Sequence, residues 1–167
     1  MIDYKAKIIS GKSLVGLEID TNINKYLNEL YSRNISVINK VYNEGKKNEI
    51  HHYIINDNVK VNTLSDGSVL NITCVNSLET KFNNDLYSGI SVKELKKKTE
   101  KQSILHGSLF LNGDYGICYV LPSPYDEIGD SINHLPDSLV LNEICVGNFS
   151  WWFKPELTPD YAKVRSD

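Results

Sequence analysis

Two short turn sequences constrain the fold of this 167-residue chain most strongly. Asp66-Gly67 and Asn112-Gly113 each separate two runs rich in apolar residues. Asp-Gly and Asn-Gly accept the positive φ angles of tight β-hairpins, so both places predict antiparallel strand pairs. The predicted strands on either side of the turns span residues 59–64, 69–75, 108–111 and 115–121.

Helical spacing predicts two helices elsewhere in the chain. Apolar residues recur at i, i+3, i+4 and i+7 from Ile23 onward, with Asp20 or Thr21 available to cap the helix. Ser91 and Glu94 have the spacing of a capping box before the second helix. We expect helices at residues 21–31 and 92–100, and further strands at residues 35–42, 50–55, 139–146 and 149–153.

These elements predict an α+β fold, mostly one antiparallel β-sheet with about two helices. At this length one domain over residues 1–167 is expected. Gly16 and Gly89 each precede a polar cap, a helix and hairpin strands, an echo that suggests two weakly related halves. From residue 154 on, Pro155 and Pro159 predict an extended tail that frays.

Composition excludes several classes of protein. A hydrophobic content of 41% and a charged content of 23% are typical of a folded soluble domain. No apolar run approaches the roughly 20 residues of a membrane-spanning helix, and the first residues lack the apolar core of a signal peptide. Three scattered cysteines, Cys74, Cys118 and Cys145, form no disulfide framework and are interpreted as small core residues. We therefore expect a cytoplasmic protein.

The charge is divided unevenly along the chain. Residues 102–162 contain one basic residue, Lys154, and eight acidic ones, whereas residues 1–101 have a small basic excess. Two interpretations stay open: the carboxylates keep the protein soluble, or they attract a basic partner. The eight acidic residues are Asp114, Asp126, Glu127, Asp130, Asp137, Glu143, Glu156 and Asp160.

No motif for catalysis or cofactor binding is found. Gly11-Lys12-Ser13 lacks the earlier glycine of a phosphate-binding loop. His51 and His52 lie in a predicted strand, where neighbouring side chains point to opposite faces and cannot share one metal ion. We predict neither a metal site nor a cofactor, and no enzymatic activity.

Aromatic residues among the acidic ones suggest a protein-binding surface instead. In a strand, Trp151 and Trp152 would point to opposite sides, which leaves one at the surface. An exposed Trp or Tyr beside acidic residues is typical of a binding hot spot. The predicted partner-binding residues are Asp114, Tyr125, Asp126, Glu127, Asp130, Asp137, Glu143, Trp151 and Trp152.

The chain resembles immunity proteins of bacterial contact-dependent growth inhibition and related polymorphic toxin systems. The likeness covers roughly residues 8–153 in general character, without a diagnostic signature. The segments that carry it are residues 66–72, 88–95, 112–117, 121–126, 130–131, 135–137, 139–144 and 151–152.

The resemblance implies tight binding of one cognate toxin domain, usually a nuclease, which the immunity protein blocks inside the producing cell. Nucleases that bind RNA or tRNA tend to be basic, so an acidic surface suits such a partner. It implies no direct contact with nucleic acid or membrane, and it does not identify the toxin or any host factor. The alternative is a small adaptor domain that binds another basic protein; an enzyme comes third.

Overall fold

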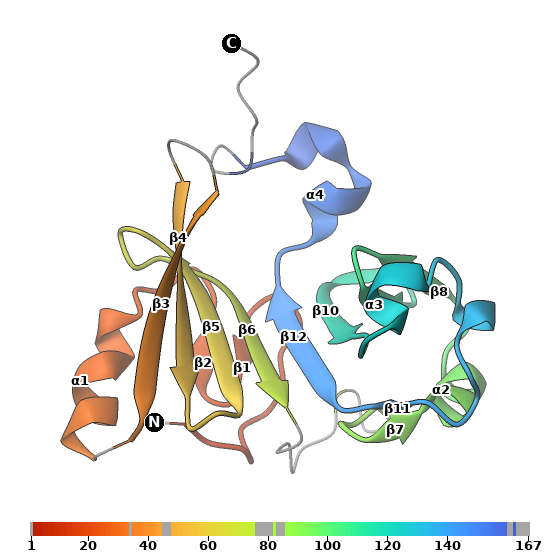
Figure 1. The fold of residues 1–167 in the computed structure, drawn as a ribbon, viewed down its shortest axis with the longest axis horizontal. Helices are drawn as coiled ribbons and strands as arrows, with labels where there is room; N and C mark the ends of the chain where they lie inside the picture. Colours follow the sequence, from red (N-terminus) through yellow and green to blue (C-terminus); the bar gives the residue numbers. More distant parts are fainter. Residues whose placement is uncertain are drawn as a thin grey trace.

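An eight-stranded antiparallel sheet forms the centre of the computed structural model (Figure 1). The structure describes residues 2–33, 35–44, 48–75, 82, 86–159 and 162. Along the sheet the strands follow the order β3-β4-β5-β6-β12-β10-β9-β8. The α+β class and the predominantly antiparallel sheet predicted from the sequence are confirmed.

The first half of the chain places a small hairpin and one helix before a four-stranded meander. Helix α1 begins at the turn of the β5–β6 hairpin, where Ile23 N–H donates to the Gly67 carbonyl at 2.9 Å. A side chain at Gly67 would meet Asn22 at 2.9 Å, so both this contact and a φ of +87° require glycine. The elements are β1 (Ser13–Leu14), β2 (Leu17–Glu18), α1 (Asn24–Ser32), β3 (Val37–Glu44), β4 (Asn48–Ile55), β5 (Val59–Leu64) and β6 (Val69–Val75).

The second half repeats the order of helix and meander. Ser91 caps the second helix by accepting a hydrogen bond from Glu94 N–H at 3.2 Å, as predicted. The elements are β7 (Ile90–Ser91), α2 (Val92–Lys98), β8 (Gln102–Leu105), β9 (Ser108–Leu111), β10 (Asp114–Val120), α3 (Tyr125–Ile128), the 3-10 helix η1 (Ile132–His134), β11 (Val140–Leu141), β12 (Glu143–Gly147), α4 (Ser150–Phe153) and the 3-10 helix η2 (Pro155–Leu157).

The two meanders meet at the pair β6–β12 in the middle of the sheet, where Ile72 pairs with Val146 and Cys74 with Ile144. Each half is therefore a helix followed by strands that lead inward to this central pair. This arrangement corresponds to the two halves that the sequence suggests.

One face of the sheet carries the main hydrophobic core. The cross-strand neighbours Val61, Ile72, Val146 and Ile117 point to this face, and helices α1 and α2 pack there with β1 and β2. On the opposite face a second, aromatic cluster covers strands β9, β10 and β12 beneath α4. Both faces of the sheet at strands β9, β10 and β12 are therefore covered. Helix α4 covers the aromatic side.

The structure corrects several local predictions. Neither Asp20 nor Thr21 caps α1, whose N-cap residue is Ile23; Asn22, just before it, accepts a hydrogen bond from Asn24 N–H at 3.0 Å. The predicted strand at residues 149–153 is wrong, since this segment forms helix α4. The run at residues 139–146 divides into β11 and β12, which belong to different sheets.

Candidate functional site: an acidic and aromatic surface

Helix α3 places acidic side chains at the surface. It follows Pro124, and the side chain of Tyr125 packs against the main core and anchors the turn. Asp126 and Glu127 occupy the first turn of the helix, where negative charge suits the helix dipole. Within the part of the chain that the structure describes, neither these two carboxylates nor Asp130 forms an ion pair.

Ile128 lies among these carboxylates and is 59% exposed. Gly129 follows it, and a side chain there would meet the Tyr125 carbonyl oxygen at 2.6 Å, so the chain turns back tightly behind Ile128. Helix α3 therefore presents one large exposed apolar side chain next to carboxylates that form no ion pair among the described residues. Sequence analysis did not identify this residue as part of a site.

Helix α4 carries the aromatic part of the surface. Phe153 stacks on Tyr115 with ring centroids 4.1 Å apart, and it also meets Phe110 edge-on at 5.2 Å. Trp152 contacts Phe110 edge-on at 6.0 Å and Phe149 at 5.0 Å. These contacts fix α4 on the sheet, because T-shaped and stacked pairs stabilise each other beyond the area that they bury.

The two tryptophans differ in their contacts, although both are half-buried. Trp152 packs onto the aromatic cluster. Trp151 meets the edge of Trp152 at 5.9 Å and belongs to neither core cluster of the described residues. The prediction that they point to opposite sides of a strand is wrong, but a difference between an inner and an outer tryptophan persists in the helix.

The turn between β8 and β9 joins the acidic helix to the aromatic one. The His106 ring lies edge-on to Trp152, with 5.1 Å between the ring centroids. Its neighbour Gly107, at a φ of +69°, packs so closely on α3 that a side chain there would meet the Asp126 carbonyl oxygen at 3.0 Å. Figure 1 shows α4 above α3 in the view, both beyond strand β12 from the first half of the sheet. We call the surface formed by His106, Asp126, Glu127, Ile128, Asp130, Trp151 and Trp152 the acidic–aromatic surface.

Three other predicted partner-binding residues form hydrogen bonds or ion pairs within the chain itself. Asp114 accepts hydrogen bonds from Ser10 Oγ and Gly116 N–H, and so ties the N-terminal segment to β10. Asp137 pairs with Lys96 at 2.9 Å, and this ammonium group lowers the pKa of the Asp137 carboxyl. Glu143 pairs with Lys60 at 2.9 Å.

Two features of α3 in the sequence could have revealed the helix. Pro124 and the acidic pair that follows Tyr125 are typical of a helix start. Ile128 then stands out as the one large aliphatic residue among these acids. The role of His106 has no comparable local signal, because its contact with Trp152 joins positions far apart in the sequence.

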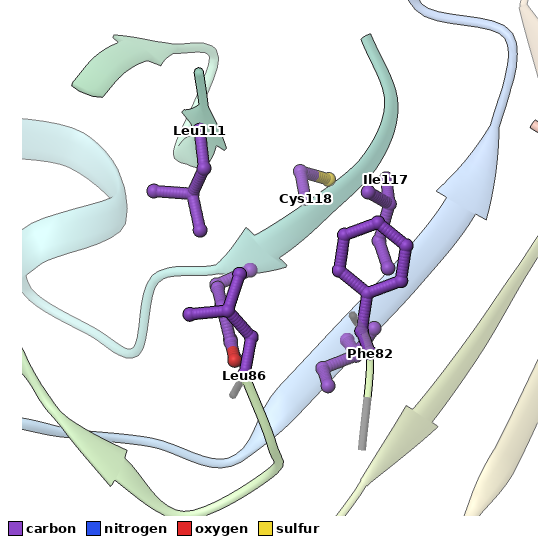
Figure 2. Close-up of a pocket in the computed structure, with 7 residues that line it drawn as sticks. Phe82, Leu86, Leu111, Ile117 and Cys118 are labelled. Atoms are coloured by element: carbon purple, nitrogen blue, oxygen red, sulfur yellow. The ribbon is translucent and has the colours of Figure 1, made fainter. Parts of the chain in front are cut away.

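A small cavity beside β10 has a mainly apolar lining. Its volume is about 20 Å³, enough for roughly one water molecule, and Figure 2 shows its mainly apolar wall. The Tyr119 hydroxyl donates to the Tyr87 carbonyl at 3.0 Å, and burial raises the pKa of Tyr119. The lining residues are Phe82, Leu86, Leu111, Ile117, Cys118, Tyr119 and Ile144.

No group of three or more His, Cys, Asp or Glu side chains suited to a metal ion occurs among the described residues. No helix in the same residues is both long and apolar enough to cross a membrane.

Comparison of the chain with protein-family models, with curated proteins and with solved structures finds no match.

Proposed function

We propose that this protein is a stoichiometric inhibitor that binds a basic partner through the acidic–aromatic surface. The observation that supports this most is the junction at His106-Gly107, which brings the unpaired carboxylates of α3 beside the half-buried tryptophans of α4. Charge of one sign next to aromatic and aliphatic anchors is what a specific protein interface requires.

The carboxylates indicate that the partner surface is positively charged. Asp126, Glu127 and Asp130 lie within five consecutive residues and have no cation to neutralise them in the described part of the chain. Their field attracts a positively charged surface and accelerates encounter with it. A nuclease presents such a surface, because it binds a polyanionic substrate.

The apolar groups provide the binding energy. Ile128 is 59% exposed, and the half-buried Trp151 meets the edge of Trp152 outside both core clusters of the described residues. Burial of such side chains at the centre of an interface, within a rim of charge, is the pattern of a hot spot. We infer that Ile128 and Trp151 insert into the partner while the carboxylates engage its basic residues.

The specific form of this function is that of an immunity protein. In this role the chain neutralises the nuclease domain of a contact-dependent growth inhibition toxin by covering its substrate-binding surface. The alternative is an adaptor that joins a basic protein to another component. An adaptor leaves its partner active, whereas an immunity protein abolishes the nuclease activity, so a nuclease assay on the complex separates the two.

Growth of cells that produce the toxin tests the proposal. The proposal predicts that the gene directly upstream of the gene for this chain encodes a large secreted protein, and the C-terminal domain of that protein is the toxin to be tested. Co-expression with the chain should restore growth, and the Ile128→Asp/Trp151→Ala variant should not. Ile38→Asp, a change at a 44% exposed position on β3, serves as the matched control and should restore growth fully. Growth arrest with every form of the chain would contradict the proposal.

A further inference from the structure

Cys118 and Cys145 face each other across the two strands at the centre of the second meander. They are direct partners in the antiparallel register of β10 and β12. Directly opposed residues of such strands have Cα atoms about 4.5–5.5 Å apart, within the range of about 4.4–6.8 Å that a disulfide spans. The backbone therefore already has the spacing of a bridge.

The two thiols contact each other in the reduced protein. They are cross-strand partners in one buried cluster, and Thr73 and Ser108 lower the pKa of Cys145 and of Cys118 respectively. In this pair the pKa of Cys145 is lowered by the hydrogen bond with Cys118, while the pKa of Cys118 is raised. The lowered pKa favours Cys145 as the attacking sulfur once the pair is exposed, because the thiolate is the reactive form.

Helix α4 shields the pair from solvent. Both cysteines belong to the aromatic cluster, together with Phe110 and Phe149, and Trp152 packs against it from α4. Helix α4 has four residues, and its aromatic side chains are only half-buried. Short, partly exposed elements open locally more easily than the core of a sheet.

We propose that Cys118 and Cys145 are a modification site at which a peroxide forms a reversible intramolecular disulfide when α4 opens. The Cys145 thiolate attacks one peroxide oxygen, breaks the O–O bond and becomes a sulfenic acid, with release of water from hydrogen peroxide. The Cys118 sulfur then attacks the Cys145 sulfur, and the hydroxyl leaves as a second water. Two thiols lose two hydrogen atoms, and hydrogen peroxide takes up the two electrons. This site is independent of the proposed inhibitor function.

Intact-mass measurement after hydrogen peroxide treatment of the folded full chain tests the site. The wild-type protein should lose two hydrogen atoms, yield one cross-linked peptide pair joining Cys118 to Cys145, and recover its mass with a thiol reductant. Cys74→Ser, a buried cysteine on the core face of the sheet, is the matched control and should form the same bridge. In Cys118→Ser, Cys145 should stop at a sulfenic acid that a dimedone-type reagent traps.

The role of α4 has its own measurement. Trp152→Ala should form the bridge about tenfold faster than wild type, because removal of its ring contacts makes local opening easier. Trp151→Ala, which removes the outer ring, should react at the wild-type rate. Free thiols at Cys118 and Cys145 after treatment of the wild-type protein, a bridge to Cys74, or direct overoxidation without a bridge would each overturn the proposal.

Discussion

The His106 ring lies edge-on against Trp152, with ring centroids 5.1 Å apart and planes at 88°. This contact links the β8–β9 turn to α4, and the same turn supports α3 through Gly107. The acidic and the aromatic groups therefore contact the same turn, although residues 106, 126 and 152 are far apart in the sequence. A partner that binds this surface contacts both groups at once.

Substitution of the two tryptophans should separate stability from binding. Trp152→Ala should lower the free energy of unfolding by about 3 kcal/mol, at the low end for buried aromatic residues because its ring is half-buried. Trp151→Ala should lower it by less than about 1 kcal/mol and weaken partner binding by about 2 kcal/mol or more. Urea denaturation and binding constants for the two variants measure this. Equal losses of stability would show that both tryptophans are structural.

Neutralising the carboxylates of α3 should slow association. The Asp126→Asn/Glu127→Gln variant should bind the partner more slowly at low salt, and the difference should shrink at high salt, where screening removes electrostatic steering. Asp20→Asn/Asp57→Asn removes the same charge from two exposed turn positions at which Asn tolerates the positive φ angles of 59° and 60°. Stopped-flow rates that are equal for the two double variants would reduce the α3 carboxylates to a role in solubility.

The sequence predicts a helix or strand well where the residues that determine it are neighbours in the chain. The strands at residues 59–64, 69–75 and 108–111 were predicted with their observed bounds, because a turn signal or an apolar run defines both ends. Strand β7 has two residues and forms only because it pairs with β11 about 50 positions away, so no local pattern predicts it. The apolar run at residues 139–146 predicts β11 and β12 as one strand and does not reveal that they belong to different sheets.

The errors at the candidate site have similar causes. Four of the five residues 149–153 are aromatic and favour strands. A four-residue element is too short to show a helical period, and the contacts with Phe110 and Tyr115 stabilise the helix instead. Whether an acidic side chain at the surface is free or forms an ion pair also depends on residues far away in the sequence. Glu143 meets Lys60 across 83 positions and Asp137 meets Lys96 across 41, pairings that sequence cannot reveal.

Gly116 should not tolerate a side chain. An added Cβ would collide with Ser10 Oγ and with the backbone of Gly11, which donates to the Gly116 carbonyl at 2.9 Å. Gly116→Ala should therefore cost about 1–3 kcal/mol through overpacking of the N-terminal segment on β10. Gly113→Ala is the control, since its positive φ strains the backbone but the space around it is open. Denaturation curves in which Gly116→Ala costs no more than Gly113→Ala would contradict the close contact.

The ion pair between Asp137 and Lys96 predicts a pH-dependent contribution to stability. The pKa of Asp137 lies below its ordinary value of 3.8, mainly because Lys96 donates to the carboxylate. A lowered pKa means that the contribution is fully present above the unfolded-state pKa and is lost as the pH falls through the folded-state pKa. In Lys96→Gln the Asp137 titration, followed by NMR, should move up toward 3.8, while Lys97→Gln should leave most of the shift in place. An unchanged titration in Lys96→Gln would remove Lys96 as the cause.

Calorimetric titration of this protein with the C-terminal domain of the protein encoded directly upstream, which the proposal predicts to be the toxin, tests the central claim most directly. An inhibitor that protects its own cell must hold the toxin almost permanently, so we predict a one-to-one complex with a Kd of about 1 nM or lower. The acidic–aromatic surface predicts that Ile128→Asp/Trp151→Ala weakens this complex by about 100-fold or more, and that Ile38→Asp leaves it unchanged. No detectable binding by the wild-type chain, or equal affinity of the two variants, would contradict the account.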